Sequence, residues 1–240
     1  MVDAVARLAE VRASSSALLA GLEAERWSDP DVREPSVLPG WTRGHVLTHI
    51  ARNGDACSRT FAGTLRGEIA LRYPDGVEGR DADIEAGSGR GAVELIADVR
   101  ESIDRLDRLC AALTEASAWN KPADGDRPAG SWLNSRWREV EIHRADLGGA
   151  YRASDWPAGF VGYLLPRMAA DVDERSQRPL RIEVTRDGST TTDLGGTVWT
   201  SGREGETVSG PDWALLAWLV GRPSLTEGRL TALPELTPWS

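Results

Sequence analysis

Apolar residues recur every three or four positions in four separate stretches of the first 150 residues. This spacing places them on one face of an α-helix, so each stretch predicts an amphipathic helix. The four stretches are residues 2–26, Thr42 to about Gly67, residues 91–116, and the segment between Gly130 and Gly148. Residues 91–116 are the most regular, with an apolar face made of Ile96, Val99, Ile103, Leu106, Cys110 and Leu113. Four such helices in succession are typical of a helical bundle.

The pattern changes after Gly148 and Gly149, a pair typical of a helix end. A helix is predicted from Pro157 to about Glu174, with a kink at Pro166. Three strands and a final helix follow, at residues 180–185, 197–200, 206–208 and 213–220. The predicted fold class is therefore α+β, with a four-helix bundle over residues 1–152 and a smaller C-terminal α/β domain over residues 153–240.

Residues 68–90 interrupt the bundle pattern with a segment that is rich in glycine and charge. Such a long connection predicts a loop, and long loops are usually functional or disordered. One interpretation is a mobile surface loop. The other is a lid that brings Arg80 or Arg90 to an anionic ligand. The residues alone leave both interpretations open.

The composition excludes several classes of protein. The chain has 240 residues, 40% of them hydrophobic, which is ordinary for a globular protein. A net charge of -9 argues against a nucleic-acid-binding protein. No window approaches 18 apolar residues, and the N-terminus has no basic stretch before an apolar one, so we expect a cytoplasmic protein without a membrane span. Cys57 and Cys110 fall on helical core positions and are expected to be buried thiols.

The candidate chemistry lies where the three histidines occur, in the second and fourth predicted helices. Glu139 and His143 are four residues apart, on the flank of an apolar stripe, and His49 lies on the flank of another. If these helices pack together, two imidazoles and a carboxylate converge with one position open, which is the ligand pattern of a catalytic Zn²⁺ or similar ion. His45 is the competing ligand, and Asp146 is a candidate to orient His143. The alternative is that these are ordinary helix-surface pairs.

Three segments together resemble the mycothiol-dependent maleylpyruvate isomerases. They are Leu38 to Asn53 with the sequence LPGWTRGHVLTHIARN, Arg80 to Gly87 with RDADIEAG, and Glu139 to Leu147 with EVEIHRADL. The resemblance extends over essentially the whole chain. It implies an N-terminal DinB-like four-helix bundle, a smaller C-terminal α/β domain, and the cofactors mycothiol and a divalent metal, for which Zn²⁺ is our expectation.

The resemblance also implies roles for individual residues. His49, Glu139 and His143 become the metal ligands, and His45 receives no ligand role. The family carries an active-site arginine at the end of a Trp-Leu-x-Gly-Arg segment, which gives this role to Arg222. Judged without the family, Arg222 is an arginine near a helix C-terminus that offsets the helix dipole.

The implied reaction converts maleylpyruvate to fumarylpyruvate in gentisate breakdown. A double bond does not rotate thermally, so the hypothesis is that a mycothiol thiolate adds to it, the resulting single bond rotates, and the thiolate leaves. Arg222 would bind a carboxylate or the enolate, and Arg80 and Arg90 could bind charge from the loop. Two alternatives stay open: a mycothiol S-transferase acting on electrophiles, and a non-catalytic, metal-stabilised binding module. A monomer is expected.

Overall fold

The computed structural model describes residues 4–170, 172–185, 198–200 and 205–238. The chain divides into two compact units, residues 1–150 and residues 151–240. The predicted boundary lay two residues further along, between positions 152 and 153.

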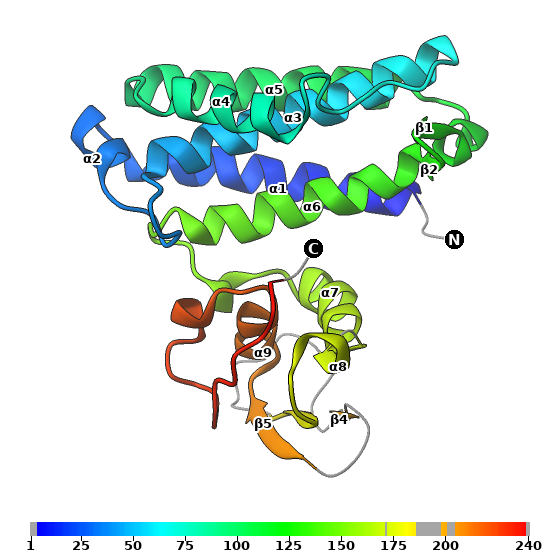
Figure 1. Ribbon diagram of the computed structural model, residues 1–240. Helices are drawn as coiled ribbons and strands as arrows, with labels where there is room; N and C mark the ends of the chain where they lie inside the picture. Colours follow the sequence, from blue (N-terminus) through cyan, green and yellow to red (C-terminus); the bar gives the residue numbers. More distant parts are fainter. Residues whose placement is uncertain (1–3, 171, 186–197, 201–204, 239–240) are drawn as a thin grey trace. The chain divides into compact units, whose positions relative to one another are not determined.

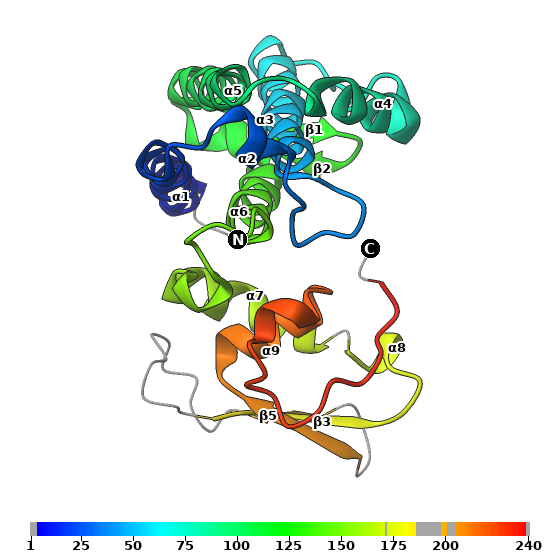
Figure 2. The ribbon, with the colours of Figure 1, turned by 90° about the vertical axis from the view of Figure 1, so that its left-hand side faces the viewer.

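The first unit is built from four long helices that run alongside one another (Figure 1). They are α1 (Ala4–Glu25), α3 (Arg43–Arg66), α5 (Ala92–Ala112) and α6 (Ala129–Asp146). Figure 2 shows α1 and α5 nearly end-on. The apolar stripes predicted for α3 and α6 are buried against the other helices, as for Ile50 and Val140, which are both 0% exposed. This packing confirms the predicted four-helix bundle.

The ends of α3 follow from local sequence. Thr42 is the N-cap, and its side chain accepts a hydrogen bond from the backbone N–H of His45. Gly67 ends the helix with a φ of +73°, a left-handed conformation that glycine adopts without steric cost. The Thr42 cap sets where α3 begins, and therefore which turn of the helix carries His49.

The segment 68–90 differs from the prediction, because it contains a helix rather than only a loop. Helix α4 (Gly76–Ser88) has just two buried residues, Ile84 and Ser88, so no apolar stripe marks it in the sequence. It forms by packing against α3, at a point where a side chain on Gly44 would lie 2.2 Å from the Ser88 carbonyl oxygen. Tertiary contact at this glycine, rather than periodicity, places α4.

Smaller elements complete the first unit. They are α2 (Asp29–Arg33), the 3₁₀-helix η1 (Ala116–Asn120), and a short antiparallel pair, β1 (Pro122–Asp124) with β2 (Arg127–Pro128), inside a segment predicted as a loop. Val5, predicted on the apolar face of the first helix, is 67% exposed. This side chain is therefore not part of the helix face that the bundle buries.

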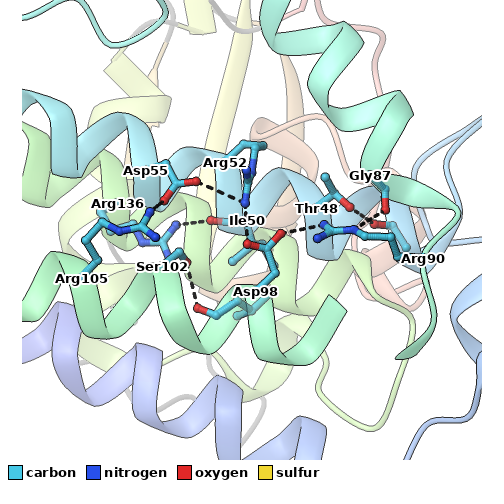
Figure 3. A network of polar contacts seen from close by, with 12 residues as sticks. Thr48, Ile50, Arg52, Asp55, Gly87, Arg90, Asp98, Ser102, Arg105 and Arg136 are labelled. Carbon is cyan, nitrogen blue, oxygen red and sulfur yellow. Dashed lines mark hydrogen bonds and ion pairs between the residues drawn. The ribbon is translucent and has the colours of Figure 1, made fainter. Parts of the chain in front are cut away.

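A network of ion pairs ties α3, α5 and the end of α4 together (Figure 3). Asp98 on α5 pairs with Arg52 on α3 and with Arg90, which follows α4. Asp55 on α3 pairs with Arg52 and with Arg105 on α5. The network lies on the side of α3 that packs against α5.

The second unit contains a small mixed sheet and two main helices. Its elements are η2 (Ala153–Asp155), α7 (Ala158–Ala170), α8 (Val172–Arg175), β3 (Leu180–Val184), β4 (Val198–Thr200), β5 (Glu206–Gly210), α9 (Asp212–Leu219) and η3 (Pro223–Thr226). The strand order is β4-β3-β5, with β3 antiparallel to β4 and parallel to β5. Every residue of α9 is buried, so this helix forms the core beside the sheet. The predicted α/β unit is confirmed.

Two details of the second unit qualify the predictions. Pro166 lies inside α7, while the end of the predicted helix is a separate short helix, α8. Residue 197, predicted to start a strand, lies outside the described residues. No helix in the described part of the chain is both long and apolar enough to cross a membrane.

Candidate metal centre

Helices α3 and α6 bring two histidines and a glutamate together inside the first unit. His49 on α3 is 8% exposed, and Glu139 and His143 on α6 are half-buried. His49 Nε2 lies 2.8 Å from Glu139 Oε2, and His143 Nε2 lies 3.3 Å from the same oxygen. The two imidazole rings are perpendicular, with centroids 4.5 Å apart. Residues ninety positions apart in the chain thus form one cluster, as the helical spacing predicted.

The cluster has dimensions that suit a small divalent ion. One ligand atom from each residue lies within 4.8 Å of the other two. Zn²⁺ binds imidazole nitrogen and carboxylate oxygen at about 2.0–2.2 Å, which puts tetrahedral ligand atoms about 3.4 Å apart. The observed separations of 2.8 Å and 3.3 Å therefore need only a small adjustment. Among the described residues, no other group of three metal-ligating side chains meets this criterion.

Asp146 orients His143. Its Oδ2 accepts a hydrogen bond from His143 Nδ1 at 2.9 Å, and the Asp146 side chain is completely buried. This contact places the proton on Nδ1 and leaves Nε2 facing Glu139, the arrangement typical of metal-binding histidines. The structure therefore supports the orienting role considered for Asp146 from the sequence.

His45 is engaged elsewhere. Its Nδ1 accepts from the backbone N–H of Thr42 at 3.1 Å, and its Nε2 lies 3.2 Å from Glu85 Oε2 on α4. Its ring also stacks on Trp41. Both nitrogens are used in capping α3 and contacting α4, so the competing ligand of the sequence analysis is not part of the cluster.

The surroundings of the cluster shift the pKa values of its two histidines in opposite directions. Burial and the neighbouring His143 lower the pKa of His49. Burial alone would also lower the pKa of His143, but hydrogen bonds to Asp146 and Glu139 raise it to about 9. Burial raises the pKa of Glu139, yet the hydrogen bonds from the two histidines outweigh it and hold this pKa well below its usual range. A carboxylate beside a protonated His143 is the metal-free state of the site.

Two residues at this site were not singled out from the sequence. The ring of Trp41 lies 5.6 Å from that of His49 and packs against it. Arg136, three residues before Glu139 on α6, is 0% exposed. Trp41 could have been found from its place just before the predicted N-cap, but nothing local indicates that Arg136 is buried.

The arginines predicted in the loop have defined partners. Arg80 on α4 pairs with Asp81, and its guanidinium carbon lies 5.9 Å from the centre of the Tyr73 ring. Arg90 donates to the Gly87 carbonyl oxygen at 3.0 Å and to Asp98 at 2.6 Å. These contacts give Arg90 a structural role. Ligand binding by either arginine stays a prediction.

Arg222 belongs to the second unit. Its Nη1 donates to the Val220 carbonyl oxygen at 2.9 Å. The side chain lines a cavity of about 520 Å³ together with Trp218 and Glu235. A cavity with a half-buried guanidinium suits an anionic group. The catalytic role of Arg222 stays a prediction.

Two solved structures are similar to this chain over nearly its whole length. Among solved structures, the crystal structure of the mycothiol-dependent maleylpyruvate isomerase has 26% sequence identity and a TM-score of 0.81, over 98% of this chain and 97% of that chain. The structure of a mutant of that enzyme, with a histidine replaced by alanine, gives 25% identity and the same TM-score and coverage.

A search of curated proteins gives no match. The family model described as "Mycothiol maleylpyruvate isomerase N-terminal domain" matches residues 8–148, more than half of the chain and all of the candidate metal centre. The chain therefore belongs to the mycothiol maleylpyruvate isomerase family and is an enzyme of this type.

Proposed function

We propose that this enzyme isomerises maleylpyruvate to fumarylpyruvate, with a divalent metal, for which we propose Zn²⁺, and with mycothiol. The observation that carries the proposal is the cluster of His49, Glu139 and His143. It occurs in a chain that aligns over 98% of its length with the crystal structure of the mycothiol-dependent maleylpyruvate isomerase. Gentisate breakdown in the cytoplasm is the proposed setting, and a monomer the proposed state.

The metal and mycothiol would together supply the nucleophile of the reaction. A bound metal would hold the mycothiol thiol as a thiolate near neutral pH, and reversible addition of this thiolate would turn the double bond of the substrate into a single bond that can rotate. His49, Glu139 and His143 would hold the metal. Asp146 fixes the ring of His143 through Nδ1 and leaves Nε2 on the side of Glu139, where it would bind the metal.

Maleylpyruvate carries carboxylates, so the proposed reaction also needs cationic side chains that bind them. Addition of a thiolate to a conjugated double bond moves negative charge onto the pyruvyl enolate. We propose that Arg222 binds a carboxylate or this charge, since its planar fork matches an oxyanion pair. Arg80 and Arg90 are proposed as further anion-binding residues, with Arg80 the stronger candidate because its partner Asp81 is exposed and Arg90 is held by Asp98.

A reconstitution assay tests the proposal. Purified protein is incubated with maleylpyruvate, with and without mycothiol, before and after chelation and Zn²⁺ return. We expect fumarylpyruvate only when thiol and metal are both present. A protein that binds Zn²⁺ but gives no turnover, and instead retains mycothiol in a product with an electrophile, would replace the isomerase by an S-transferase. Zn²⁺ binding with no thiol-dependent chemistry would indicate a binding module.

The two histidines of α3 provide a matched pair of variants. His49→Ala removes a proposed ligand, so bound Zn²⁺ and turnover should both be lost, with turnover reduced at least about 100-fold. His45→Ala removes a cap contact instead and should keep Zn²⁺ at one ion per chain. Metal content by atomic emission and the isomerase assay check both variants. Full activity in a metal-free His49→Ala protein would contradict the proposal.

A further inference from the structure

A fully buried arginine lies between the two helices that carry the candidate metal ligands. Arg136 is 0% exposed, although arginine is rarely buried without a charged partner. It lies three residues before Glu139 on α6, on the preceding turn of the same side of the helix. The Arg136 side chain therefore lies inside the first unit, and it comes from the helical turn that precedes Glu139.

Arg136 joins α6 to α3 next to His49. Its Nη1 donates to the Ile50 carbonyl oxygen at 2.7 Å and to Asn53 Oδ1 at 3.1 Å. Figure 3 shows the contact between Arg136 and Ile50. Ile50 directly follows His49 in α3, and Arg136 lies three residues before Glu139 in α6. These bonds set the spacing of the helices where the ligand side chains meet.

Arg136 is poorly suited to a purely stabilising role. Its Nε and Nη2 are buried and have no hydrogen-bond partner within the part of the chain that the structure describes. Buried charges are costly, and apolar side chains of similar volume often leave a protein equally or more stable. The Ile50 carbonyl lies inside α3, where the helix itself supplies a donor. An apolar residue could therefore fill this position without loss of the fold.

We propose that Arg136 is a positioning residue of the metal centre, which holds α3 against α6 so that His49 Nε2 meets Glu139 and His143 at ligand distance. The proposal rests on the metal-binding part of the proposed function and not on the isomerase reaction. Both hydrogen bonds leave from one nitrogen, so a lysine ammonium can reproduce them. A methionine fills comparable space and donates nothing.

The test measures Zn²⁺ affinity by chelator competition, and the Co²⁺ absorption spectrum, without mycothiol or maleylpyruvate. R136M should keep or raise the unfolding midpoint of the metal-free protein, yet bind Zn²⁺ at least about tenfold more weakly and alter the Co²⁺ spectrum. R136K should remain within about threefold of wild-type affinity. Wild-type affinity in R136M would overturn this proposal alone. Wild-type protein that binds no Zn²⁺ would overturn the proposed function as well.

Arg52 provides the matched control. It also lies on α3, three residues after His49, but pairs with Asp55 and Asp98 and so joins α3 to α5 instead of α6 (Figure 3). R52M should lower the unfolding midpoint and keep the wild-type Zn²⁺ affinity. Equal weakening of Zn²⁺ binding by R52M and R136M would show that any loosening of the bundle suffices, and would overturn the proposal.

A second variant covers the case in which R136M does not fold. N53A removes one of the two acceptors of Nη1 and leaves the guanidinium in place. It should weaken Zn²⁺ binding by more than about threefold, because one of the two hydrogen bonds that hold Arg136 against α3 is lost. Unchanged Zn²⁺ affinity in folded N53A would overturn the proposal.

Discussion

His143 holds its proton through contacts at both ring nitrogens. Asp146 lies 2.9 Å from Nδ1, and Glu139 lies 3.3 Å from Nε2. Burial works against the charged ring, but these carboxylates raise the pKa of His143 to about 9. Metals bind neutral imidazole, so an incoming ion has to displace this proton. Binding of the proposed metal at His143 should therefore depend on pH.

Zn²⁺ affinity should therefore rise with pH. Between pH 6.5 and 9 the metal-free protein carries a proton on His143 that binding releases, so affinity should increase about tenfold per pH unit and level off above pH 9. His49 adds no proton to this count, because burial and His143 lower its pKa from 6.5. Chelator competition at a series of pH values measures the slope. A flat profile over this range would contradict the assignment of His143.

The stability of the metal-free protein should show the opposite trend. The pKa of His143 is raised from 6.5 to about 9 on folding, so its contribution to stability is complete below pH 6.5 and is lost as pH rises through 9. Urea unfolding with chelator present should show a falling free energy of unfolding across this window. The variant His143→Gln should lack this fall.

Helix α4 is held in place by close approach rather than by an apolar face. A Cβ at Gly44 on α3 would lie 2.2 Å from the backbone oxygen of Ser88, an atom that cannot move without shifting α4. The Arg90–Asp98 pair ties the end of this helix to α5. The position of Arg80, carried on α4, therefore depends on the contact at Gly44.

Gly44→Ala should destabilise the protein, although alanine favours a helix interior by about 1 kcal/mol over glycine. Steric overlap with Ser88 should outweigh this gain and lower the free energy of unfolding by about 1–3 kcal/mol. Gly162→Ala is the control, because an added Cβ there would meet no atom within 4 Å beyond its chain neighbours and the adjacent backbone of α7, and it should be neutral or stabilising. Thermal unfolding of both variants measures these changes in stability. A stabilised Gly44→Ala protein would show that α4 shifts freely.

The division into two units separates the proposed chemistry. All three candidate metal ligands lie within residues 1–150, whereas Arg222 lies within residues 151–240. Each unit has its own core, with Ile50 and Val140 in the first and Ile182 and Leu216 in the second. Metal binding and substrate turnover should therefore be separable by truncation.

A fragment of residues 1–150 should fold, bind one Zn²⁺ with the affinity of the full chain, and show no isomerase turnover. The full-length variant Arg222→Ala should also retain Zn²⁺, but its turnover should be reduced about 10²–10³-fold rather than abolished, as for loss of one oxyanion-stabilising group. Metal titration and the isomerase assay measure both properties. Turnover by the fragment at the full-chain rate would exclude a catalytic role for Arg222.

The sequence alone determined those features that depend on local periodicity. Burial of one helix face requires apolar residues every three or four positions, so the four long helices were predictable, as were the flanks carrying His49, Glu139 and His143. The start of α3 at Thr42 and its end at Gly67 could be predicted because helix capping depends on only a few neighbouring residues. The strand β3 was likewise visible as strict alternation.

Only the tertiary structure decided what depends on segments far apart in the chain. Periodicity could not show which of His45 and His49 lies beside Glu139 and His143. The structure places His49 in that cluster and His45 in contact with Thr42 and Glu85. Nor could periodicity find α4, whose stability comes from packing against α3, or assign Arg90 to Asp98. The burial of Arg136 was equally hidden, because its hydrogen-bond acceptors lie more than eighty residues earlier in the chain and only the packing of α6 on α3 brings them together.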